Sequence, residues 1–255
     1  MKRSTLFLAG GVLVLGFFLV GGVFAIRLSL VTVKPTSSVA QGPGTLALEV
    51  AGQASSTRAL GAGESVTLDL GAVRALETSG SWKVTLVPGP AGHATLRAPR
   101  AASFAIRVSG GPDNLRFDLS DSPGSGWTWS GGGEAALEIS APDLGKIDAS
   151  GTSAFALEGL RSSRLEINLS GASSVSGSGS VDDLDLALSG ASSVNLDGVS
   201  AQRVRVQGSG AGAITVRSAG GAVEGELSGA VNLRIGGTPA SIRVDTSGMA
   251  SVTRS

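Results

Sequence analysis

The chain has 255 residues, of which 39 are glycine, while aromatic residues make up only 4% and tyrosine is absent. Its formal net charge is +0, so it carries no excess of basic residues of the kind that nucleic-acid binding requires. Cysteine is also absent, which excludes disulfides, thiolate metal ligands, cysteine nucleophiles and lipidation at cysteine.

The N-terminus carries an apolar segment, Leu6–Ile26, which follows Lys2 and Arg3 and contains no charged residue. Its length matches the roughly 20 residues that a helix needs to cross a bilayer. We predict that residues 1–33 form a transmembrane signal anchor, with a signal peptide cleaved after Ala25 or a buried core helix as alternatives. The anchor would hold the rest of the chain at the inner membrane, facing the periplasm or the cell exterior, whereas cleavage would release a secreted protein. Residues 34–45 are polar, contain proline and glycine, and are predicted to be a linker.

Residues 46–142 contain short segments in which apolar and polar residues alternate and which end in turn-forming residues, such as "SWKVTLVPG" and "NLRFDLSD". This pattern predicts short strands that form an N-terminal cap and irregular early coils. Within "GSGWTWSGGG", Trp127 and Trp129 are expected on one face of a strand. They are candidate ligand contacts that could stack on a sugar ring, and the alternative is that they close the hydrophobic core at a coil end.

A Ser-Gly pair then recurs six times, at intervals of 20, 19, 20, 19 and 19 residues. The pairs are Ser150 and Gly151, Ser170 and Gly171, Ser189 and Gly190, Ser209 and Gly210, Ser228 and Gly229, and Ser247 and Gly248. A fixed period of this length is typical of a solenoid.

Apolar and polar residues alternate on both sides of each Ser-Gly pair, as in "RLEINLS" and "DLDLALS", which indicates two short strands per repeat. We therefore predict that residues 143–255 are regular coils of an all-β, single-stranded parallel β-helix, with about 19–20 residues per coil. Successive coils would stack about 4.8 Å apart, so that Leu169 and Leu188 lie directly above one another. Glycine suits the bends, and the serine column is expected to form a ladder of hydroxyl groups along the axis.

The repeats "INLSGASSV" and "LALSGASSV", together with "RALETSGSWKVTLVPG" upstream, resemble the bacterial family called putative autotransporter adhesin, head GIN domain. The resemblance runs from roughly Val73 to Val252. It implies a secreted or surface-exposed, right-handed β-helix with no established enzymatic activity.

Candidate catalytic groups are few. His93 is the only histidine and lies in a predicted turn, so the serines of the repeat have no evident base beside them. Stacking would place Glu166 and Asp185 about 5 Å apart, between Lys146 and Arg205. Such a carboxylate pair could carry out acid–base chemistry, but the mixed charges of this column favour a solvent-facing ladder of ion pairs.

No cofactor and no metal is predicted. Asp182, Asp183 and Asp185 in "VDDLDL" are weak calcium candidates, because the glycine-aspartate repeat of calcium-binding β-rolls is missing.

The sequence thus favours a non-enzymatic, extracytoplasmic binding or structural module of the bacterial cell envelope, adhesin-like in character. Its expected partners are the membrane, through the N-terminal segment, and a glycan or an envelope protein, but not nucleic acid. One alternative is a polysaccharide-processing enzyme that uses Glu166 and Asp185. The other is a scaffold that associates with itself end to end through its open C-terminal coil.

Overall fold

The computed structural model describes residues 27–29, 44–50, 56–100, 104–111, 113–120 and 133–255. In these ranges the protein is all-β: no helix occurs, and the strands belong to one 14-stranded sheet. None of these ranges contains a helix that could span a membrane. The apolar segment Leu6–Ile26, on which the predicted anchor rests, lies outside them.

The strands are β1 (Arg27–Ser29), β2 (Gly44–Val50), β3 (Ser56–Leu60), β4 (Ser65–Asp69), β5 (Ala75–Leu86), β6 (His93–Arg97), β7 (Ala105–Gly111), β8 (Asn114–Ser120), β9 (Ala135–Ile139), β10 (Lys146–Gly171), β11 (Ser174–Ser218), β12 (Ala222–Gly237), β13 (Ser241–Thr246) and β14 (Ser251–Arg254). Residues 27–29, predicted as part of the N-terminal membrane or signal segment, instead form a strand that pairs antiparallel with β4.

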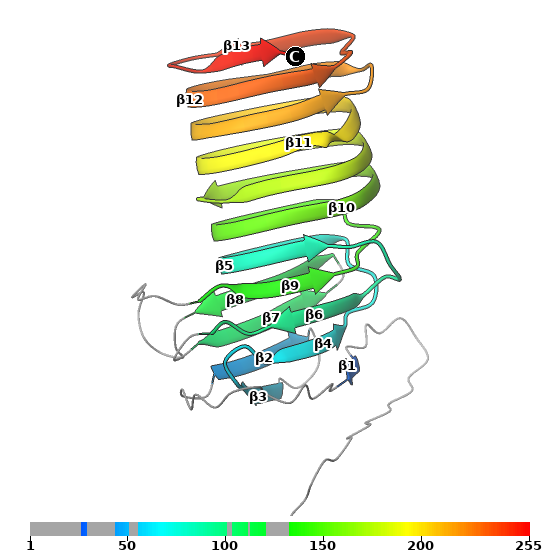
Figure 1. The fold of residues 1–255 in the computed structure, drawn as a ribbon, viewed down its shortest axis with the longest axis vertical. Helices are drawn as coiled ribbons and strands as arrows, with labels where there is room; N and C mark the ends of the chain where they lie inside the picture. The colour runs from blue at the N-terminus through cyan, green and yellow to red at the C-terminus, as the bar shows by residue number, and fades with distance from the viewer. Residues whose placement is uncertain (1–26, 30–43, 51–55, 101–103, 112, 121–132) are drawn as a thin grey trace, which may run out of the picture.

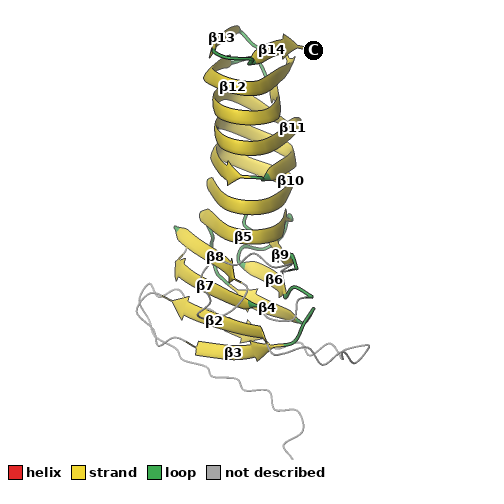
Figure 2. Cartoon of the chain, turned by 90° about the vertical axis from the view of Figure 1, so that its left-hand side faces the viewer, coloured by secondary structure: helices red, strands yellow, loops and turns green. Residues whose placement is uncertain are grey.

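The three longest strands, β10, β11 and β12, carry the repeats and wind around the long axis of the molecule, one coil per repeat (Figures 1 and 2). Their pairing is parallel, and equivalent residues of successive repeats are partners: Leu169 pairs with Leu188, and Ser170 pairs with Ser189. The predicted vertical stacking of equivalent residues is confirmed. The strands continue through the Ser-Gly bends at Ser150, Ser189, Ser209 and Ser228, where the two short strands expected in a repeat are one longer strand. The chain instead leaves the strand after Gly171, and Ser247 and Gly248 lie between β13 and β14, which are two short strands as expected.

The irregular spacing of 19 or 20 residues has a local cause. Between β10 and β11, the partners are 20 residues apart up to Leu157 and Gly177, and 19 residues apart from Leu160 and Gly179 onward. The register therefore shifts by one residue at the second bend of the coil, in the manner of a β-bulge. Because the shift falls at this bend, equivalent residues of the two repeats remain partners on both sides of it.

The sheet divides below β5 into two arms. The first half of β5, Leu76–Ser79, pairs with β8, which leads through β7 and β2 to β3. The second half, Trp82–Leu86, pairs with β9, which leads through β6 and β4 to β1. Both arms contain antiparallel pairs, and they lie at the opposite end of the molecule from β13 and β14 (Figure 1).

Columns of aliphatic side chains fill the interior of the coils. One column runs through Ile147, Ile167, Leu186 and Val206, each of which is at most 2% exposed. Each buried aliphatic side chain contributes about 1.5–3 kcal/mol relative to exposure to water. Stacked columns of this kind compensate for the scarcity of aromatic residues, and they also fix which side chains of each strand point to the surface.

Candidate functional site

A groove runs along the stack on the surface of the strand segments that precede the Ser-Gly bends, and we call it the axial groove. It has a volume of about 960 Å³. The lining side chains come from seven coils and occupy the column serine and the two positions before it: Glu77, Thr78, Asp148, Ala149, Ser150, Asn168, Leu169, Ser170, Ala187, Leu188, Ser189, Gln207, Gly208, Ser209, Glu226, Leu227, Ser228, Asp245, Thr246 and Ser247. Seven coils spaced about 4.8 Å apart give the groove a length of roughly 30 Å.

The serine column forms one side of the axial groove, and its hydroxyls do not bond to one another. Each hydroxyl donates instead to a backbone carbonyl of the preceding coil. For example, Ser170 Oγ donates to the carbonyl of Ala149 at 3.4 Å, and Ser209 Oγ donates to that of Leu188 at 3.4 Å. The column of serine hydroxyls along the axis is thus connected by hydroxyl-to-carbonyl bonds rather than by bonds between hydroxyls. Each serine keeps its lone pairs for an acceptor role in the groove.

The column also begins one coil earlier than the repeat in the sequence suggests. Ser79 and Gly80 of β5 pair with Ser150 and Gly151, 71 residues later. Ser150 Oγ donates to the carbonyl of Thr78 at 3.3 Å, as in the later coils. The signal in the sequence is the match between "ETSGSWKV" and "DASGTSAF".

The opposite side of the groove carries side chains two positions before each serine. Asn168 Nδ2 donates to Asp148 Oδ1 at 2.6 Å and to Glu166 Oε1 at 2.8 Å, which leaves its Oδ1 as an acceptor. At the far end, Glu226 and Asp245 are register partners and have no ion-pair partner among the described residues. The lining includes four carboxylates and neither lysine nor arginine. Glu77 is paired with Arg116 and Asp148 with Lys146, so the negative charge of the groove that is unpaired within the described ranges lies at Glu226 and Asp245.

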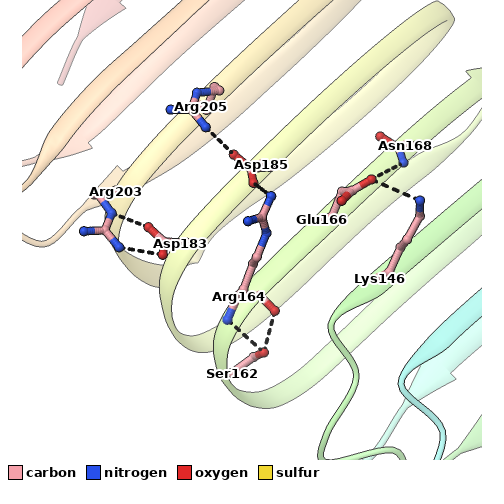
Figure 3. A network of polar contacts seen from close by, with 9 residues as sticks. All are labelled: Lys146, Ser162, Arg164, Glu166, Asn168, Asp183, Asp185, Arg203 and Arg205. Atoms are coloured by element: carbon pink, nitrogen blue, oxygen red, sulfur yellow. Dashed lines mark hydrogen bonds and ion pairs between the residues drawn. The ribbon is translucent and has the colours of Figure 1, made fainter. Parts of the chain in front are cut away.

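A network of ion pairs lies beside the groove, two residues further from the serine column (Figure 3). Glu166 and Asp185 are register partners, as predicted. Lys146 Nζ lies 3.1 Å from Glu166 Oε1, while Arg205 Nη1 lies 3.5 Å from Asp185 Oδ1. Arg164 Nη2, which the sequence reading did not include, is closer to Asp185 Oδ2, at 2.8 Å. The expected ion-pair ladder is confirmed: Glu166 is paired with Lys146, and Asp185 with Arg164 and Arg205.

Electrostatics in this network oppose general acid catalysis. Hydrogen bonds from Asn168 and Lys146 hold the pKa of Glu166 below its ordinary value, and the hydrogen bond to Glu166 raises the pKa of Lys146. A general acid that works near neutral pH needs a raised carboxyl pKa. The shift of Glu166 is in the opposite direction, so this carboxylate is suited to pairing with Lys146 rather than to donating a proton.

Two of the three calcium candidates, Asp183 and Asp185, are paired with arginines. Asp183 forms a two-point contact with the guanidinium of Arg203, and this hydrogen bonding lowers the pKa of Asp183 (Figure 3). Asp185 contacts Arg164 and Arg205. Within the described ranges, no group of three or more histidine, cysteine or acidic side chains is arranged to hold a metal ion.

The remaining candidates from the sequence are His93 and the two tryptophans, Trp127 and Trp129. His93 is exposed and begins strand β6, where it pairs with Asp69, so its predicted position in a turn is wrong. It lies in the N-terminal arms and does not line the axial groove. Trp127 and Trp129, the candidate ligand contacts, lie outside the described residues.

The Lys146–Glu166 pair leads to a prediction about pH. Glu166→Gln should lower the free energy of unfolding by at most about 1 kcal/mol near pH 7, because the pair is partly exposed. A lowered folded-state pKa stabilises the protein above the unfolded pKa, and this contribution disappears as the pH falls through the folded pKa. Urea unfolding should therefore separate the variant from the parent at about pH 7 but not at about pH 3.

The control for this measurement is Glu226→Gln, since Glu226 has no ion-pair partner in the described part of the chain. Its effect should be smaller and of the opposite sign, because it removes repulsion with Asp245. An equal loss of stability for Glu166→Gln at both pH values would contradict an electrostatic origin.

Several solved structures of bacterial proteins are similar to this chain. A solved structure described as a putative adhesin from Bacteroides fragilis is similar with a TM-score of 0.52 and 13% identity, over 75% of this chain and 96% of that one. A putative lipid binding protein from Parabacteroides distasonis has a TM-score of 0.38 and 12% identity, over 76% of this chain and 97% of that one. A putative adhesin from Parabacteroides merdae has a TM-score of 0.34 and 12% identity, over 82% of this chain and 99% of that one.

No curated protein matches the sequence. A family model does match it, over residues 72–239, which is more than half of the chain. That range includes β5, the ion-pair network and most of the axial groove. The resemblance seen in the Ser-Gly repeats is thereby confirmed, and the chain belongs to the family described as putative auto-transporter adhesin, head GIN domain.

Proposed function

We propose that this protein is a non-enzymatic, extracytoplasmic binding module of the bacterial envelope. In this proposal, residues 143–255 form a right-handed β-helix, and the apolar segment Leu6–Ile26 holds it at the membrane. The adhesin description of the family supports a binding role outside the cytoplasm. The in-register parallel pairing of successive repeats supports a solenoid.

The observation that carries the proposal is the axial groove, which is long, open and built from the same side-chain positions in seven coils. A site of this shape fits an extended chain better than a compact metabolite, which would leave most of the groove empty. The repeated serines suit a ligand whose own hydrogen-bonding groups recur along its length.

Charge and hydrogen bonding narrow the ligand class. The groove offers serine lone pairs, carboxylates and the Asn168 amide oxygen, so a good ligand must supply donors. Hydroxyl groups of a glycan are such donors, and amino groups would add attraction to Glu226 and Asp245. A polyanion would be repelled by the unpaired carboxylates of Glu226 and Asp245. We therefore infer a linear neutral or amino-sugar glycan, rather than an acidic polysaccharide.

A substitution in the middle of the groove tests this function. Ala187, a half-buried lining residue, pairs with Asn168 of the preceding coil. Ala187→Trp should fill the groove and weaken glycan binding at least about tenfold, the effect of losing roughly 1.4 kcal/mol. The measurement is binding of the full chain, in mild detergent, to an array of linear neutral, amino-sugar and anionic polysaccharides.

The matched control is Asn195→Trp, which adds the same side chain at an exposed position outside the groove. It should bind as the parent does. Retained binding by Ala187→Trp would show that the groove is not the site. Binding confined to anionic polysaccharides would refute the assignment of the ligand class.

A further inference from the structure

The strands β13 and β14 lie at the end of the stack far from the two arms (Figures 1 and 2). Each pairs with β12 and with no other strand that the structure describes. The two large hydrophobic side chains that are exposed in the described residues, Ile242 at 37% and Met249 at 82%, both belong to this last coil. Val244 and Val252 are only partly buried against the core. A sheet edge with apolar side chains beside it is a surface that favours strand pairing.

The backbone direction of β13 determines which residues can pair. The amide of Ser247, next to β13, donates to the carbonyl of Leu227 in β12 at 2.8 Å. Peptide groups alternate in direction along a strand, so those of Ile242, Val244 and Thr246 are directed to the open side. In an antiparallel pair, hydrogen bonds form between facing residues whose peptide groups are both directed toward the other strand. A partner strand must therefore place such residues opposite Ile242, Val244 and Thr246.

The sequence of β13, "SIRVDT", satisfies this condition when it pairs with a second copy of itself. An antiparallel pair centred on Val244 places Val244 opposite its copy and Ile242 opposite Thr246, so outward-directed groups meet. The same register places Arg243 opposite Asp245, and Asp245 opposite Arg243. Both side chains are exposed. These form two opposite-charge pairs at the non-hydrogen-bonded positions, where facing side chains are closest.

We propose that β13 is an isologous dimerisation edge, through which two copies of this chain pair antiparallel around a two-fold axis at Val244. The pairing covers the end of the core on both copies and continues the sheet from one stack into the next. Because the two stacks meet end to end, their N-terminal arms lie at opposite ends of the dimer. A dimer of this shape can connect two surfaces. This proposal does not depend on glycan binding, although Asp245 also lines the end of the axial groove.

Cysteine cross-linking tests the register, and the natural absence of cysteine makes the background clean. An equimolar mixture of full chains carrying Arg243→Cys and Asp245→Cys, one with an added tag to distinguish its mass, should form a disulfide-linked heterodimer in detergent solution. The facing residues would have Cα atoms about 4.5 Å apart, within disulfide range. Each variant alone should cross-link much less, because diagonal neighbours lie about 7–8 Å apart.

The control pair lies one coil earlier, where Glu224 and Glu226 are the register partners of Arg243 and Asp245. A mixture of Glu224→Cys and Glu226→Cys should give no heterodimer, because β13 covers that coil. This control also separates pairing at β13 from any association through the N-terminal segment. Equal cross-linking of both mixtures, or no cross-linking of the first, would overturn the proposal.

Sedimentation equilibrium of uncross-linked full chains provides an independent measurement. Arg243→Asp and Asp245→Arg should each raise the dimer dissociation constant roughly tenfold, because each places like charges opposite one another twice. The double variant Arg243→Asp/Asp245→Arg restores opposite charges and should return close to the parent value. Weakening by the double variant equal to the sum of the single effects would refute the antiparallel register.

Discussion

Replacement of Gly190 by alanine is expected to lower the free energy of unfolding by about 4 kcal/mol. Gly190 has a φ of 90°, a conformation that residues with a Cβ rarely adopt. A Cβ at this position would also lie 2.6 Å from the carbonyl oxygen of Gly171 in the coil below. That atom belongs to the backbone and cannot rotate away, so the alanine must displace a coil as well as tolerate a strained φ.

Two other glycines separate these contributions. Gly220 has a φ of 114° but no atom within 4 Å of its hypothetical Cβ, so Gly220→Ala should show only backbone strain, about 1–2 kcal/mol. Gly111 has neither a positive φ nor a close neighbour, and Gly111→Ala should be close to neutral. Urea unfolding of all three variants, followed by far-UV circular dichroism, gives the comparison. If Gly190→Ala cost no more than Gly220→Ala, close stacking of the glycine column would not be the constraint.

The sequence predicts the stack well because equivalent residues of successive repeats have the same neighbours, and the same residue types therefore recur at each position. The recurrence of Ser-Gly and the alternation of "INLS" and "LALS" determine which residues pair and which face inward, and the partners of Leu169 and Ser170 follow directly. The alternation does not extend through the bend. In "LSGASSV", Ser170 is exposed whereas Ser173 is buried, and the letters alone do not distinguish these two serines.

The repeat pattern does not predict pairing between strands that are far apart in the sequence. Ser79 is separated from Ser150 by strands β6 to β9, so the first coil of the column does not share the 19- or 20-residue interval. The antiparallel pairs in the arms depend on which short strands meet in space, and alternation within each strand does not specify this. The division of the sheet at β5 could therefore not be predicted.

The repeat pattern predicts part of the candidate site, because the register determines which residues of successive coils are neighbours. The pairing of Glu166 with Asp185 follows from the register, and so do the neighbouring Lys146 and Arg205. Arg164 occupies a different column and reaches Asp185 diagonally through its long side chain, which a column-by-column reading misses. The axial groove is lined by consecutive positions of each coil, buried ones such as Leu169 included, and a list of outward positions does not reveal it.

Trp82→Ala is the second substitution with a large expected effect, a loss of about 3–5 kcal/mol in the free energy of unfolding. Trp82 is 0% exposed and packs edge-to-face against Phe117, with ring centroids 5.7 Å apart. Its indole Nε1 donates to the carbonyl of Ser79 at 2.8 Å. Alanine would leave a cavity at the junction of β5 with both arms and would remove the donor from a part-buried carbonyl.

Trp82→Phe distinguishes packing from the hydrogen bond. Phenylalanine keeps an aromatic ring against Phe117 but cannot donate to Ser79, so the loss should be intermediate, about 1–3 kcal/mol. Far-UV circular dichroism during urea unfolding is the suitable measurement, since the substitution itself removes an indole fluorophore. Ser153, the register partner of Trp82 in the next coil, is also buried, so the cavity expected in Trp82→Ala would border the stack. A loss below about 1 kcal/mol for Trp82→Ala would mean that the arms and the coils unfold independently, and that this tryptophan does not connect them.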